Sequence, residues 1–214
     1  MSSTDQPLRG DKSTSRRYSP SRMLAFSDGV FAIAITLLVL PLTEIDLEPD
    51  RLAGQLEAAA PRIVVFVVGF AVIGVYWLSH HAWYSRVRAV DDKLLKINLV
   101  VLACVAFLPF PTSVLGTHSG TSGTVFYAAA VAVTGASIVV MWVYLLRNPE
   151  LLEADSATPL LRHIVIGLVT PAVFAASIPV ALITADGGKL FWIVIWPVSG
   201  IASRLVSRRI PYQS

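Results

Sequence analysis

The sequence predicts an all-α membrane protein with six transmembrane helices. Of its 214 residues, 55% are hydrophobic and only 14% are charged, whereas a soluble domain is about one quarter charged. The mean hydropathy is +0.67, and the apolar residues fall into six separate blocks. Because about 20 helical residues cross the hydrocarbon core of a bilayer, each block is long enough to span it.

The apolar blocks place the six spans, in chain order, at 22–42, 62–82, 94–115, 124–146, 160–184 and 189–206. Ser19 followed by Pro20 is typical of the N-cap and first turn of a helix, so the first span begins there. Pro41 lacks the backbone N–H that a continuing helix needs, and it marks the end of this span.

Proline and glycine divide the later spans. Pro109 and Pro111 predict a kink late in the third span, because each removes one helical hydrogen bond. Asn148-Pro149 ends the fourth span, and Asp186-Gly-Gly separates the fifth from the sixth. These signals predict separate membrane helices joined by turns.

Lysine and arginine are distributed unequally between the two sides of the spans. Fourteen of the 17 flank one side, and only Arg51, Arg62 and Lys189 flank the other. By the positive-inside rule both termini are cytoplasmic, in a multi-pass protein of the cell membrane. This placement argues against a nucleic-acid-binding face. We expect a disordered cytoplasmic tail at 1–18, a membrane domain at 19–209 and a cytoplasmic end at 210–214.

Polar side chains occur at a similar depth on the first three predicted helices: Ser27, Asp28, Trp77, His80, His81 and Asn98. Because an unpaired polar group is costly in hydrocarbon, we expect one hydrogen-bonded cluster that fastens the three helices together. Either histidine can join it, and Arg22 can neutralise Asp28 or extend to lipid headgroups. A gate or proton relay is the alternative role for this cluster.

Ile33, Leu37 and Leu40 follow helical spacing i, i+4, i+7 on the first span, with Thr36 beside them. If several copies of this helix surrounded an axis, these residues would form stacked apolar rings that constrict a pore. Without such an arrangement, an apolar stripe of this kind faces lipid or packs against other helices.

Three motifs occur in order along the first three spans. Arg22-x-x-x-Phe26-Ser27-Asp28 leads directly into Gly-Val-Phe-Ala-Ile-Ala-Ile-Thr-Leu-Leu-Val-Leu, and Trp77-Leu-Ser-His80-His81 and a run from Asp92 through Asn98 follow. Together they resemble the signature of the transmembrane-protein-175 potassium channel family. The resemblance covers helices one to three closely, whereas helices four to six match only in length and number.

The resemblance implies a homotetramer of six-helix subunits around a central pore that the first helices line. It implies passive potassium flux through an apolar constriction at Ile33, Leu37 and Leu40, with Thr36 as a polar layer. The residues it implies to be structural are Arg22, Phe26, Ser27, Asp28, Trp77, His80 and Asn98. The expected partners are other copies of the chain, transient K⁺ in the pore and membrane lipids, with no cofactor and no fixed metal site.

The residues bear on two other classes of protein. An enzyme is disfavoured because a membrane aspartyl protease needs two intramembrane acids and only Asp28 qualifies, and because no glycine elbow accompanies Ser27. The alternative function is a proton-coupled secondary transporter that uses Asp28 and His80. Asp28 is near the cytoplasmic face, whereas such carriers bind their substrate at mid-bilayer.

Overall fold

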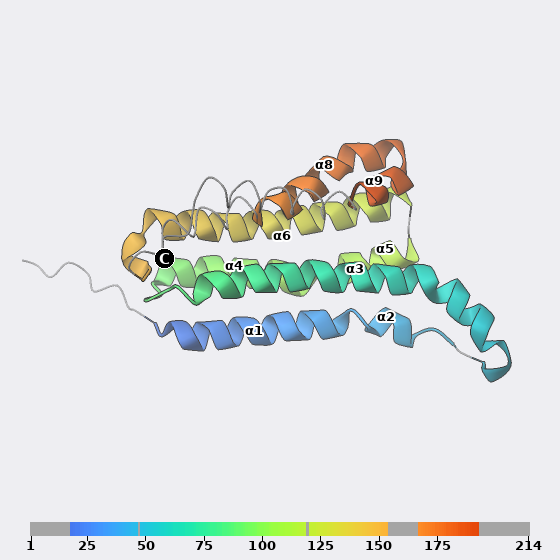
Figure 1. Cartoon of the computed structure of the whole chain (residues 1–214), viewed down its shortest axis with the longest axis horizontal. Coiled ribbons are helices and arrows are strands. Elements are labelled where there is room, and N and C mark those ends of the chain that lie inside the picture. Colours follow the sequence, from blue (N-terminus) through green and yellow to red (C-terminus); the bar gives the residue numbers. More distant parts are fainter. Residues whose placement is uncertain (1–17, 47, 119, 154–166, 193–214) are drawn as a thin grey trace, which may run out of the picture.

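The computed structural model describes residues 18–46, 48–118, 120–153 and 167–192. Within them the chain is helical, and the α-helices are α1 (Pro20–Leu37), α2 (Leu40–Thr43), α3 (Leu52–Tyr84), α4 (Asp92–Phe107), α5 (Pro109–Thr117), α6 (Thr121–Arg147), α8 (Val169–Ile183) and α9 (Ala185–Phe191). Two short 3₁₀ helices, η1 (Pro49–Arg51) and η2 (Pro149–Leu151), precede α3 and follow α6. Helix α1 lies along one edge, α3 to α5 lie beside it, and α6, α8 and α9 follow in turn (Figure 1).

Four of the predicted spans are long and apolar enough to cross a membrane: Pro20–Thr43, Pro49–Tyr84, Asp92–Thr117 and Thr121–Arg147. The described part of the fifth is the apolar 15-residue helix α8. Most of the sixth, predicted at 189–206, lies outside the described residues, as do the terminal segments. The all-helical membrane class is confirmed, and the described residues hold four full spans.

Three predicted boundaries differ from the structure. Helix α3 begins at Leu52 and not near Arg62, because Pro61 is accommodated inside the helix. The third span is divided at the position of the predicted kink, because α4 ends at Phe107 and α5 begins at Pro109, with only Leu108, in helical conformation, between them. Asp186-Gly-Gly is not a break, since it lies inside α9. The chain turns instead at the extended Thr184, whose hydroxyl accepts a hydrogen bond from the Gly187 N–H.

Helix α6 is the centre of the bundle, because it packs against α4, α5 and α8. Its close contact with α8 and α3 depends on Gly135, where a β-carbon would lie 2.5 Å from Pro171 Cβ and 2.8 Å from the Tyr76 hydroxyl. That hydroxyl donates a hydrogen bond of 2.8 Å to the Val131 carbonyl. A glycine is needed here to let three helices meet.

Gly135→Ala is therefore expected to destabilise the fold by about 1–3 kcal/mol, because the added methyl group forces the helices apart. Thermal unfolding in detergent measures the effect. Gly74→Ala on α3 is the matched control, since a β-carbon there meets nothing within 4 Å. Equal melting temperatures for the two variants would contradict the packing described here.

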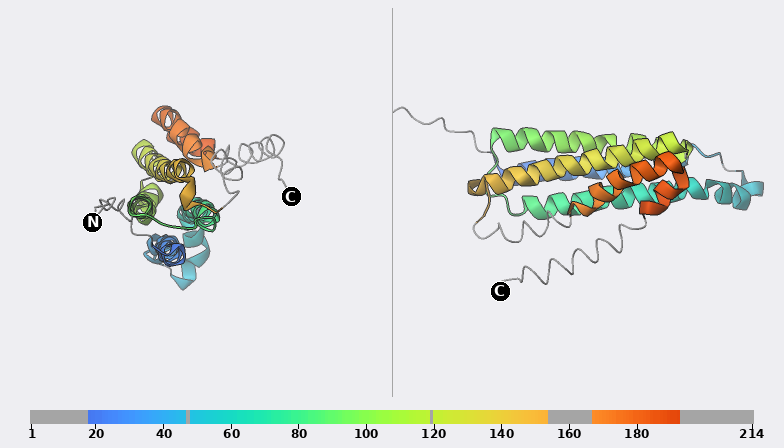
Figure 2. Two further views of the ribbon diagram at one scale, coloured as in Figure 1. Left: turned by 90° about the vertical axis from the view of Figure 1, so that its left-hand side faces the viewer. Right: turned by 90° about the horizontal axis from the view of Figure 1, so that it is seen from above.

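Helix α1 is covered on one side only. Its buried side chains, Met23, Ser27, Phe31 and Ala34, and that of Leu38 just after it, face α3, α4 and the start of α5. The end-on view shows α1 at the margin of the bundle, on the side opposite α8 (Figure 2). Among the described residues, no element covers its other side.

Candidate ion pathway and its polar anchor

The predicted pore stripe lies on the uncovered side of α1. Ile33 is 61% exposed, Leu37 40% and Leu40 51%, and Thr36 is exposed beside them. Their neighbours Ala34 and Leu38, by contrast, are buried against the bundle. A single chain thus leaves a row of large apolar residues with 40–61% of their surface uncovered.

The stripe crosses a break in the helix just before Pro41, the residue that the sequence marks as the end of the first span. The N–H groups of Leu38 and Val39 bond the carbonyls three residues before them, at 3.3 Å each, which is 3₁₀ geometry. The cause is Pro41, which offers no N–H to the Leu37 carbonyl. Because residues three apart are aligned in a 3₁₀ turn, Leu40 remains on the same side as Leu37 although it belongs to α2.

Thr36 contributes an oxygen to the same side. Its hydroxyl donates a 2.8 Å hydrogen bond to the Ile33 carbonyl. A hydroxyl group has one proton and two lone pairs, so the Thr36 oxygen is left as an acceptor. It can accept a hydrogen bond from water or contact a cation with its free lone pairs.

Behind the stripe, a buried hydrogen-bonded chain joins α1, α4 and α3. The Asn98 side-chain N–H donates to Ser27 Oγ at 3.1 Å, and Ser27 Oγ donates to the Met23 carbonyl at 2.9 Å. Asn98 Oδ1 lies 2.8 Å from His80 Nε2, and since this oxygen only accepts, the proton of His80 is on Nε2. Ser27, His80 and Asn98 are fully buried, so this polar anchor holds α1 in place from inside the bundle.

Aromatic rings enclose His80 in this anchor. Tyr84 stacks on the imidazole with ring centroids 4.5 Å apart, and Phe31 packs at 5.4 Å. Sequence reasoning missed both residues. The signal was present in their spacing, because Phe31 follows Ser27 and Tyr84 follows His80 by four residues, which places each pair on one helix face.

Asp28 belongs to a second contact, separate from the anchor. Trp77 Nε1 donates to Asp28 Oδ1 at 2.9 Å, and His81 Nδ1 lies 3.9 Å from the same oxygen. Asp28 is only half-buried, and His81 is exposed. The expectation of one shared cluster was wrong, because Ser27 and Asp28 are adjacent on a helix and their side chains point about 100° apart. Each histidine therefore joins a different contact.

The two remaining motif residues lie on the uncovered side of α1. Arg22 is exposed and forms no ion pair with Asp28 in the part of the chain that the structure describes. Phe26 is exposed too. Both continue the stripe of Ile33 toward the start of the helix, at spacings of three to four residues through Gly29.

Asp28→Ala is expected to leave the Trp77 indole N–H without its acceptor, not His80 or Asn98. Because the site is half-exposed, water replaces the lost bond in part and the cost is below about 1.5 kcal/mol. Asp28→Asn retains the side-chain oxygen and is expected to restore the melting temperature. Trp fluorescence and thermal unfolding test this, and a loss above that of Asn98→Ala would contradict the separation of the two contacts.

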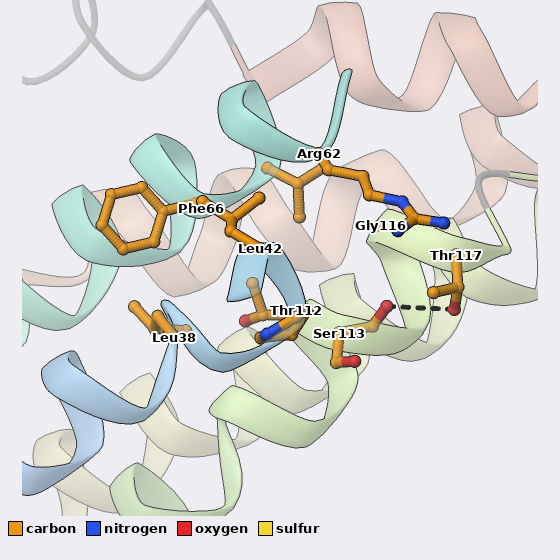
Figure 3. Close-up of a pocket in the computed structure, with 10 residues that line it drawn as sticks. Leu38, Leu42, Arg62, Phe66, Thr112, Ser113, Gly116 and Thr117 are labelled. Carbon is orange, nitrogen blue, oxygen red and sulfur yellow. Dashed lines mark hydrogen bonds between the residues drawn. The ribbon is translucent and has the colours of Figure 1, made fainter. Parts of the chain in front are cut away.

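Neither of the two described crevices follows the stripe. One, of about 20 Å³, lies beside the junction of α1 and α2, where Leu38, Leu42, Phe66 and Thr112 line it (Figure 3). The other, of about 290 Å³, lies between α3, α6, the start of α8 and Gly167 just before it. A route for ions along the stripe would therefore have to form between chains. No group of three or more potential metal-ligating side chains occurs among the described residues.

Known proteins resemble this chain over the part that contains the stripe and the polar anchor. Residues 22–109, from the start of the stripe to the α4–α5 break, match the family described as the endosomal/lysosomal potassium channel TMEM175. A potassium channel of Streptomyces collinus is 37% identical over 147 residues, which are 66% of this chain and 71% of that protein. The chain belongs to the TMEM175 family.

Other TMEM175-family relatives match over smaller shares of their length. A potassium channel of Chamaesiphon minutus is 43% identical over 101 residues, 45% of this chain and 49% of that protein. The human endosomal/lysosomal proton channel TMEM175 is 31% identical over 169 residues, 73% of this chain and 33% of that protein. The chain thus spans less than half of these two relatives.

A solved structure shares the fold. The crystal structure of a lysosomal potassium-selective channel TMEM175 homolog from Chamaesiphon minutus superposes with a TM-score of 0.73 at 24% identity. The match covers 86% of this chain and 97% of that one. The helical bundle is therefore the TMEM175 fold.

Proposed function

We propose that this chain is a subunit of a potassium-permeable channel and that four copies turn the uncovered side of α1 toward a common axis. The observation that supports this best is the row of exposed Ile33, Thr36, Leu37 and Leu40 on a helix whose opposite side is buried. The bacterial relatives named potassium channels support the same ion. The protein is a channel and not an enzyme.

In this arrangement the stripe forms the constriction. Rings of Ile33, Leu37 and Leu40 are apolar, so water leaves the pore readily and an ion must shed part of its hydration shell to pass. Potassium has a lower dehydration free energy than sodium, so the barrier to crossing the constriction is lower for potassium. A ring of Thr36 hydroxyl oxygens, whose lone pairs are available, then contacts the ion and replaces part of its lost hydration. This mechanism gives modest selectivity, and we propose no fixed metal site.

The polar anchor has a structural role in this proposal. Asn98 ties Ser27 of α1 to His80 of α3 inside the bundle, so the helix that lines the pore is held from behind. Arg22, Phe26, Asp28 and Trp77 complete the set of residues that position α1. We place the membrane domain at 19–209 in the cell membrane, with both termini cytoplasmic by the positive-inside rule.

The carrier alternative loses support from the geometry. It requires Asp28 and His80 to act together, but they contact different partners. The span Pro20–Thr43 has 24 residues and is about 36 Å long. Asp28 lies eight residues after Pro20, about 12 Å along this span, and so nearer its start than its middle, whereas carriers bind their substrate at mid-bilayer.

Planar-bilayer recording of the purified full chain tests the proposal, with mass measurement in detergent beside it. We expect step-like openings that reverse near the potassium equilibrium potential and a mass of four chains. Slow, saturable flux without steps would support the carrier instead. Because vertebrate relatives are named proton channels, proton current is measured under the same gradients, and a current carried by protons alone would overturn the potassium assignment.

A further inference from the structure

Three segments far apart in the sequence meet at the end of the bundle where α1 begins. The Tyr18 N–H bonds the Val90 carbonyl at 2.8 Å, and the Arg88 N–H bonds the Leu151 carbonyl at 2.8 Å. The Glu153 N–H in turn bonds the Arg86 carbonyl at 3.0 Å. We call these residues, Tyr18, 86–90 and 150–153, the clasp.

The clasp is packed as well as hydrogen-bonded. Val87, Val90, Leu151 and Leu152 are buried in the same apolar core that contains Met23 of α1. A side-chain bond from Arg88 to the Glu150 carbonyl, at 3.2 Å, adds a further link. Because buried apolar residues and paired backbone groups occur together, the loop between α3 and α4 has a defined position relative to the end of α6.

One bond of the clasp joins the pore helix to this assembly. Tyr18 precedes Pro20, the first residue of α1, by two positions, and the Met23 N–H bonds the Ser19 carbonyl at the start of the helix. Movement of the α3–α4 loop or of the end of α6 is therefore transmitted to α1 through the backbone.

We propose that the clasp is a conformational device that holds the inner end of α1 and favours the closed pore. This inference rests on the proposed function, in which the uncovered side of α1 lines the axis. In the closed pore the four apolar stripes lie together at the axis. A clasp that holds the inner end of each α1 keeps the stripe of that helix at the axis. Release of the Tyr18–Val90 bond lets the inner end move outward and favours opening.

Tyr18→Pro tests the inference, because proline lacks the N–H that bonds Val90. Tyr18→Ala is the matched control, since it removes the same side chain and keeps the N–H. In single-channel recordings of the full chain, Tyr18→Pro is expected to raise the equilibrium constant for opening by at least about fivefold, since one typical hydrogen bond is worth about fivefold in each subunit and all four subunits lose it. Unitary conductance is expected to stay unchanged, and Tyr18→Ala is expected to behave as the wild type.

The outcomes separate this inference from the proposed function. If the wild type carries no potassium current, the proposed function fails, whereas equal opening in wild type and Tyr18→Pro overturns the clasp alone. Equal increases in Tyr18→Pro and Tyr18→Ala also overturn it, because the side chain would then be the cause. If Tyr18→Pro does not assemble, Glu153→Pro replaces it, because proline at this position removes the N–H that bonds the Arg86 carbonyl. Glu153→Ala is its control, and only the proline variant is expected to raise the equilibrium constant for opening.

Discussion

Ile33→Ser is expected to raise the potassium current through single channels at least about tenfold. Ile33 is the most exposed side chain of the stripe, and in the proposed tetramer it narrows the pore with a branched apolar group. Burying or exposing such a side chain changes free energy by about 1.5–3 kcal/mol, and each 1.4 kcal/mol removed from a barrier raises a rate about tenfold. Serine both widens the ring and holds water in it, so the preference for potassium over sodium is expected to fall as well.

The measurement is the unitary conductance and the reversal potential under a potassium–sodium gradient. Val133→Ser on α6 is the matched control, since Val133 is 60% exposed but lies on a helix away from the stripe. Because Ile33 is 61% exposed within one chain and loses little buried surface on substitution, the folding of Ile33→Ser is expected to be normal. Unchanged permeation in a correctly assembled Ile33→Ser channel would remove the stripe from the ion pathway.

Asn98→Ala is expected to have the largest effect on stability. Among the residues that the structure describes, Asn98 alone bridges Ser27 and His80, so its loss leaves the His80 N–H buried without an acceptor. An unsatisfied buried donor costs about 1–3 kcal/mol, and the cavity left by the side chain adds to this. A total of about 2–4 kcal/mol corresponds to a Tm lower by roughly 4–16 °C for a chain of this size.

Thermal unfolding in detergent, with the mass of the assembly before heating, measures this loss. Leu99→Ala is the control on the same helix, because Leu99 is 47% exposed and its truncation opens no cavity. Any tetramers of Asn98→Ala that survive are expected to keep the wild-type preference for potassium, since Asn98 does not face the stripe. A wild-type Tm with altered selectivity would instead give Asn98 a direct role in permeation.

The membrane class, the position of α1 and the alignment of Ile33 and Leu37 on one helix face follow from local sequence. Apolar blocks and the spacing of Ile33 and Leu37 repeat at the period of a helix, and this period alone assigns residues to faces. A contact between a histidine of the second span and Asn98 is also predictable from the sequence, because both are placed at a similar depth by their positions in the spans and polar groups in a membrane pair with one another. The residues alone do not decide between His80 and His81, since the two are adjacent and lie at nearly the same depth along the helix.

The chain's own pattern of apolar, basic and proline residues was sufficient to establish an all-α membrane protein whose first helix bears a row of large apolar side chains. Packing between helices determined the contacts. Asn98 bonds His80 and not His81, Asp28 accepts its hydrogen bond from Trp77 outside the polar anchor, and the Tyr18 N–H bonds the α3–α4 loop. The physical reason is that periodicity describes one helix at a time. Which buried donor meets which acceptor depends on distances between segments that lie far apart along the chain.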